Sequence, residues 1–251
     1  MSWIESASPS FACRHSSLHA ADAARVLALL ESTRSRLSEV LPQSDHEPTI
    51  VLHDSPHALA LANPMLPLVW KMTARPARRY VAGWTKPGEV HVLSPSALRE
   101  RASRVSGSFE MLALAPATLY VRRAIMDHNR DLRNAHGPVA IWRQISWAWL
   151  LEGASRWLSR ESAYGRLVLG RFLLSGHRPH FPPSVREAPL VAASLFELLA
   201  EMEGKAGIAR LISRLHSEGW RSALQGAFAG RDLGLIENEW RSRLMVLEQA
   251  S

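Results

Sequence analysis

The first hundred residues alternate short apolar runs with segments whose apolar residues recur at helical spacing. The run at 49–53 predicts a strand because it is β-branched and apolar, and the run at 11–15 can form another. Between them, residues 18–41 predict a helix that ends at Pro42. Its expected buried face carries Val26, Leu30, Leu37, Val40 and Leu41.

Serine followed by proline marks two expected helix starts, at Ser55-Pro56 and Ser94-Pro95. A serine side chain can cap a helix, and proline suits its first turn. Asn63-Pro64 should end the first of these helices. The runs at 79–84 and 89–93 flank a Pro-Gly turn, which predicts a β-hairpin.

Beyond residue 95 the pattern predicts helices and no further strand. The expected helices are about 108–126, 145–160, 162–174, 189–203, 206–217 and 233–248. Strands followed by helices indicate an α+β protein with a small mixed sheet and a predominantly helical part. We expect one domain over 1–251, with an N-terminal α/β lobe at about 1–105 and a helical lobe at about 106–251.

Composition narrows the protein class. The 251 residues contain one cysteine, Cys13, which excludes a disulfide framework and a cysteine-based zinc cluster. No run approaches the ~20 apolar residues of a membrane span, so we expect no membrane association. The first residues lack the basic-then-apolar layout of a secretory signal, and we expect a cytoplasmic protein.

The net charge of +7 invites a nucleic-acid interpretation. However, 27 of the 30 basic residues are arginine, and they are dispersed along the chain. No segment interleaves basic residues with aromatic ones, as single-strand binders do. We therefore do not expect specific nucleic-acid binding.

The most informative segment is Trp149-Leu150-Leu151-Glu152-Gly153-Ala154-Ser155-Arg156-Trp157-Leu158. It resembles the W-L-x-E-G-x-A-x-x-L signature of gluzincin zinc metallopeptidases, the peptidase-MA-like family, with Ser155 in place of alanine. The resemblance implies a thermolysin-like fold and makes Glu152 the third zinc ligand, on a helix beside the one that carries HExxH.

Three other segments are similar to parts of that family. Residues 91–95, from His91 to Pro95, look like its active-site edge strand entering the next helix. Residues 190–207 are similar to the helix and glycine-containing turn that follow the signature. Trp240-Arg241-Ser242-Arg243-Leu244 looks like the Trp-Arg-x-x-Leu that often closes these domains.

The HExxH motif itself is missing from the chain. Aligned on its apolar pattern, residues 109–121 put Ala115 and Leu119 at the two histidine positions and Pro116 at the general-base glutamate. Alanine and leucine cannot bind a metal, and proline cannot accept a proton. We therefore expect neither zinc nor another cofactor. Pro116 also predicts a kink, or a helix that breaks and restarts, between Leu112 and Pro116.

Without a metal, Glu152 has a simpler interpretation as the partner of Arg156 in a partly exposed i,i+4 ion pair. The alternative is a vestigial cleft, formed by His91, Trp149, Glu152 and Arg156, that still binds a small or cationic ligand.

Three functions follow from these residues. The first is a metallopeptidase-like protein that has lost zinc and catalysis and binds an unidentified protein or peptide. The second is an atypical metal-dependent hydrolase that uses Glu152 with loop histidines such as His128, His136, His177 or His180. The third is a basic helical protein associated with nucleic acid.

Overall fold

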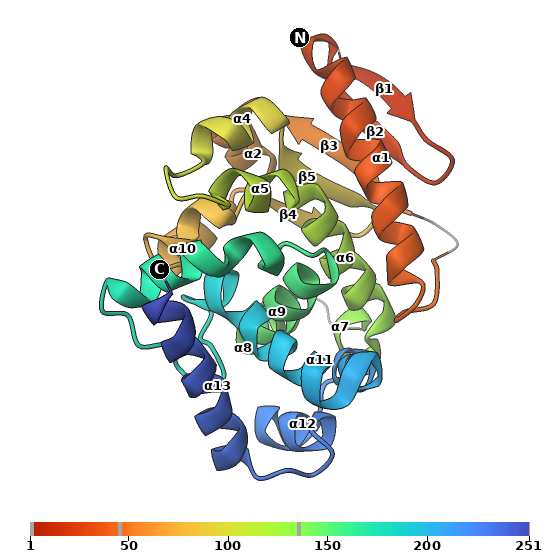
Figure 1. The fold of residues 1–251 in the computed structure, drawn as a ribbon. Coiled ribbons are helices and arrows are strands. Elements are labelled where there is room, and N and C mark those ends of the chain that lie inside the picture. Colours follow the sequence, from red (N-terminus) through yellow and green to blue (C-terminus); the bar gives the residue numbers. More distant parts are fainter. Residues whose placement is uncertain (1–2, 45–46, 135–136, 251) are drawn as a thin grey trace.

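The computed structural model describes residues 3–44, 47–134 and 137–250, in which a five-stranded mixed sheet is packed against helices (Figure 1). The strand order is β1-β2-β3-β5-β4. The three central strands are parallel, and each edge strand is antiparallel to its neighbour. The strands are β1 Trp3–Ala7, β2 Ala12–Ser16, β3 Thr49–His53, β4 Gly83–Lys86 and β5 Glu89–Leu93. The expected α+β class with a small mixed sheet is confirmed.

The alternation of side chains along β5 separates the two faces of the sheet. Val90 and Val92 are buried on one face, whereas Glu89 and His91 point to the other. Helix α6, Ala115–His128, packs against β4 and β5 on the valine side, and α1, Ala20–Leu37, lies beside α6 and β2.

The two expected serine caps are confirmed. Ser55 and Ser94 accept hydrogen bonds from the main-chain N–H groups of Ala58 and Ala97, and each is followed by proline in the first helical turn. The short helices of this region are α2 Pro56–Ala62, α3 Leu66–Met72, α4 Pro95–Arg101 and α5 Ser108–Ala113.

Every strand of the described chain lies before residue 94, and helices follow. α9 packs between α6 and α11, and α13 packs on α10 and α11. α12 and the start of α13 lie at the end of the molecule far from the sheet, and α13 runs back from there to the C-terminus beside α10 (Figure 1). These helices are α7 Arg130–Arg133, α8 Gly137–Ser146, α9 Ala148–Leu158, α10 Ser162–Leu174, α11 Ala188–Ser213, α12 Trp220–Ala227 and α13 Leu233–Gln249.

Several elements differ from the sequence-based expectations. β1 was not expected, because four of its five residues are exposed and leave no apolar pattern. The run at 79–84 is not a strand throughout: residues 77–80 form a 3-10 turn, and the strand begins at Gly83. The helix expected at 145–160 corresponds to α9, which begins at Ala148, whereas α8 lies almost entirely before residue 145 and was not expected. α3 and α12 were also missed; they have seven and eight residues, too few for a clear helical period.

The expected division between 203 and 206 is present inside α11. Gly204 has φ of 65° and ψ of −166°, which interrupts the helix where the glycine-containing turn was expected. Buried residues from Phe11 to Leu244 form one hydrophobic cluster that includes both the sheet and the helices. In the part of the chain that the structure describes, no helix is long and apolar enough to cross a membrane.

Candidate functional site

Pro116 lies where one helix stops and the next begins. α5 ends at Ala113, α6 begins at Ala115, and Pro116 occupies the first turn of α6. Proline has no main-chain N–H to donate, and the N–H groups of a first helical turn have no acceptor within the helix. Proline at this position therefore removes no helical hydrogen bond. The expected break between Leu112 and Pro116 is confirmed.

The three residues aligned with the HExxH chemistry are part of the core. Ala115, Pro116 and Leu119 are all buried. Leu119 lies against β4 at Gly83, where even one added Cβ atom would overlap Leu119 Cδ1 and the His91 carbonyl oxygen. These side chains pack the sheet onto α6.

Glu152 instead meets a different residue of α6. Its Oε1 atom is paired with Arg122, and its Oε2 atom accepts a hydrogen bond from Arg156 Nε at 3.1 Å. The Glu152 side chain is 15% exposed, and that of Arg156 is 6% exposed. The expected Glu152–Arg156 pair is therefore present and Glu152 is partly exposed, but the pair does not stand alone within α9. Arg122, 30 positions earlier, makes it part of a buried network between two helices.

A second carboxylate completes the network on the side of α10. Glu161, directly before α10, is paired with Arg156 and accepts a hydrogen bond from Thr118 Oγ1 at 2.6 Å. Thr118 is also 2.8 Å from the Ser159 hydroxyl, and Arg156 donates to the main-chain oxygen of Tyr80 at 3.1 Å. The network thus joins α6, α9, the start of α10 and the turn before β4.

Electrostatics keep Glu152 ionised inside the protein. Burial opposes its charged form, but Arg122 and Arg156 outweigh burial and lower the pKa of the carboxyl. Burial likewise opposes the charge of Arg156, whose pKa is nevertheless raised because Glu161 and Glu152 favour the cation. Burial dominates at Glu161 and raises its pKa, although Arg156 and Thr118 act in the opposite direction.

These contacts do not fit a zinc ion. Both Glu152 oxygens are bound by guanidinium groups, which are cations without a lone pair for a metal. Two side chains of α6 bond to the carboxylates of the network: Thr118 bonds to Glu161, and Arg122 bonds to Glu152. These two α6 residues are spaced i,i+4. The alignment from sequence used positions three residues earlier, 115 and 119, whose side chains are packed in the core.

The expected cleft of His91, Trp149, Glu152 and Arg156 is not formed. His91 points to the face of the sheet away from α6 and stacks on Trp84, with ring centroids 4.2 Å apart. Trp149 contacts the rings of Trp147 and Phe196. Of these four residues, Glu152 and Arg156 are joined by an ion pair, and His91 lies on the opposite face of the sheet.

His91 belongs to a separate chain of polar side chains on β3 and β5. Its Nε2 atom is 2.8 Å from Glu89 Oε2, and its Nδ1 atom is 3.0 Å from His53 Nε2. Burial and the neighbouring His91 lower the pKa of His53 to about 4, and burial lowers that of His91. Both rings are therefore neutral near pH 7, with His53 donating to His91 and His91 donating to Glu89.

The histidines expected in loops make other contacts, and one of them, His128, is not in a loop but is the last residue of α6. His128 lies 3.2 Å from the Ala124 oxygen, His177 lies 2.9 Å from the Ser175 hydroxyl, and His180 lies 3.2 Å from Glu187. His136 lies outside the described residues. Among the residues that the structure does describe, no three of His, Cys, Asp and Glu gather as metal ligands would.

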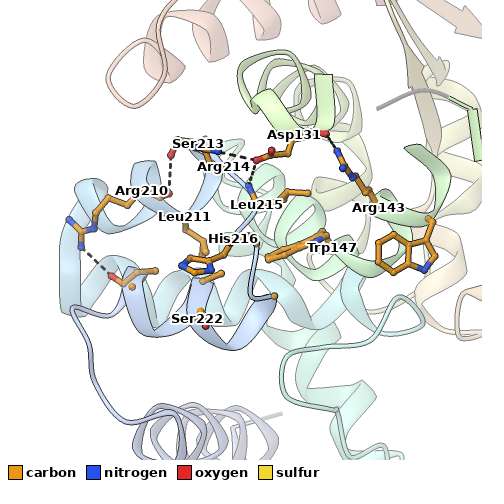
Figure 2. A pocket seen from close by; sticks show the side chains of 16 residues that line it. Asp131, Arg143, Trp147, Arg210, Leu211, Ser213, Arg214, Leu215, His216 and Ser222 are labelled. Atoms are coloured by element: carbon orange, nitrogen blue, oxygen red, sulfur yellow. Dashed lines mark hydrogen bonds and ion pairs between the residues drawn. The ribbon is translucent and has the colours of Figure 1, made fainter. Parts of the chain in front are cut away.

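A groove that the sequence did not reveal lies between α8 and the connection from α11 to α12 (Figure 2). Its volume is about 780 Å³, and its basic residues are Arg143, Arg210, Arg214 and His216. The sequence signal was slight: Arg210 and Arg214 are spaced i,i+4, but Arg143 is nearly 70 positions away. No protein-family model, no curated protein and no solved structure matches this chain.

Proposed function

We propose that this chain is a gluzincin-like protein in which a buried ionic network has replaced the zinc centre, and that it acts without catalysis. Its role is to bind a protein or peptide partner. The arrangement of two helices supports this proposal. α9, with its W-L-x-E-G segment, packs beside α6, as the third-ligand helix of that family packs beside the HExxH helix. One part of the resemblance changes: β5 lies inside the sheet, so the edge strand beside α6 is β4.

The observation that carries the proposal is that Arg122 and Arg156 bind Glu152. In a gluzincin this carboxylate would bind zinc, and the α6 residues opposite it would be histidines. A guanidinium supplies the positive charge that the metal would otherwise supply. The network then holds α6 and α9 together, which is a structural task in place of a chemical one.

The experiment restores metal ligands at the positions that face α9. Thr118→His with Arg122→His places two imidazoles one turn apart, about 5–6 Å between Cβ atoms, beside Glu152. We expect this variant to bind zinc more tightly than the parent, and Glu152→Gln in the same background to weaken binding. The readout is a zinc titration, with circular dichroism to verify folding.

The matched control is Ala115→His with Leu119→His, which has the same spacing on the same helix. Because Leu119 packs against β4, we expect this pair to gain no zinc affinity. The proposal fails if the folded 118/122 variant binds zinc no better than the parent. It also fails if parent protein purified without added metal carries about one zinc per chain by elemental analysis.

A further inference from the structure

The groove beside α8 is open to solvent and is lined by residues from two parts of the chain. Its walls come from the region of α7 and α8 on one side and from the end of α11, the following loop and α12 on the other. Figure 2 shows Arg210 at one end and Arg143 with Trp147 at the other, and His216 and Ser222 lie between them. The side chains of Arg210 and Arg214 are 50% and 70% exposed, so a bound molecule would remain in contact with solvent along its length.

The groove is strongly basic. Of the described residues that line it, three are arginines and only Asp131 is acidic. Asp131 is already engaged, because its Oδ2 atom accepts the Leu215 N–H at 3.0 Å and lies 3.9 Å from Arg214 Nε. The positive charge of the groove therefore exceeds what its own carboxylate can balance.

The arginines are held in place mainly by main-chain oxygens. Arg143 donates to the carbonyl oxygen of Asp131, and Arg210 donates to that of Ala227 at 3.2 Å. Among the described residues, the closest carboxylate to Arg210 is Glu203, at 3.7 Å. A carbonyl orients a guanidinium but leaves its charge intact, so both arginines keep donors for a carboxylate ligand.

An apolar surface continues from the groove along α8. Trp142 lines the groove and is 66% exposed. Val139, Ile141 and Ile145 are also exposed, and no residue of α8 is buried. A helix whose apolar side chains face solvent gains free energy when a partner covers them.

We propose that this groove binds an acidic, extended peptide segment of a partner protein, with apolar side chains resting on Trp142 and α8. Charge complementarity selects the carboxylates, and the exposed apolar side chains of α8 beside the groove offer contacts to a longer chain that a small molecule confined to the groove would not make. The amide groups of a peptide can also form hydrogen bonds with the serines and His216 of the groove. A nucleic acid carries a phosphate on every nucleotide, and its negative charge would be repelled by Asp131. This inference does not depend on the metallopeptidase resemblance.

The test measures fluorescence anisotropy of a labelled peptide that alternates glutamate and leucine. Arg143→Gln and Arg214→Gln should each weaken its binding about threefold to tenfold, because each removes one charged donor. The matched control is Arg178→Gln, because Arg178 is 68% exposed and pairs with Glu248 outside the groove. We expect this control to change affinity less than twofold.

Two probes distinguish other ligands at the same salt concentration. Labelled single-stranded DNA that binds more tightly than the peptide, and is weakened by the same groove variants, would overturn the proposal in favour of nucleic acid. Competition by inorganic phosphate at concentrations equal to those of the peptide would overturn it in favour of a small-anion site. An absence of peptide binding, or an equal effect of Arg178→Gln, would also overturn it. If Arg143→Gln fails to fold, the exposed Arg214 provides the test alone.

Discussion

Replacing Glu152 by glutamine tests whether the network is a buried structural unit. The substitution keeps the shape of the side chain and removes its charge, so that Arg122 loses its carboxylate partner and Arg156 keeps its pair with Glu161. Arg156 is 6% exposed and cannot regain its hydration without opening the structure. Removing one partner of a buried pair typically costs about 3–5 kcal/mol.

The free energy expected here lies at the lower end of that range. Arg122 is 22% exposed and can still reach water, so we expect Glu152→Gln to cost about 3 kcal/mol. An exposed helical pair would cost about 0.3–0.5 kcal/mol. For a chain of this size, a loss of about 3 kcal/mol lowers Tm by roughly 6–12 °C. Urea denaturation followed by circular dichroism measures the difference directly.

A matched control is present in α13. Glu237 and Arg241 form an i,i+4 pair whose side chains are 36% and 42% exposed. Glu237→Gln makes the same chemical change at the same spacing, and we expect it to cost less than about 0.5 kcal/mol. If Glu152→Gln is no more destabilising than Glu237→Gln, the network does not hold the helices together and this reasoning is refuted.

Two further predictions concern the sheet. The pKa of His53 is lowered from 6.5 to about 4 in the folded protein, so between these two pH values the unfolded chain binds more protons than the folded one. The free energy of unfolding should therefore fall by about 3 kcal/mol as the pH drops from about 6.5 to 4. Urea unfolding at several pH values should show a smaller loss for His53→Gln than for the parent. Gly83→Ala should destabilise the protein by several kcal/mol because the added Cβ atom overlaps the His91 oxygen and Leu119. Gly226→Ala is the control, because the space around Gly226 is open and the protein should lose no stability. Thermal melting of both variants measures the difference.

Several features of this protein were determined by the sequence alone because they depend on neighbouring residues. Ser55 and Ser94 begin helices, Pro116 starts α6 and Gly204 interrupts α11, each through main-chain geometry within one turn. The Glu152–Arg156 pair also follows from i,i+4 spacing. The α+β order of strands and helices could be predicted for the same reason.

Other features were decided by the tertiary structure because their residues are distant in the chain. Nothing in the local pattern shows that Arg122 meets Glu152 or that His53 meets His91. The face of α6 was also hidden, because residues 115–121 are all buried and show no polar side from which to orient the helix.

The groove illustrates the same limit at the surface. Arg143 and Arg214 approach Asp131 only because α8 folds back beside the end of α11, which brings together dispersed arginines that looked unremarkable in sequence. Long-range packing depends on how whole faces of helices and sheets fit together, whereas a single sequence records only the composition of each face. Local chemistry therefore determined where the elements of this protein begin and end, and packing decided which of its charges meet.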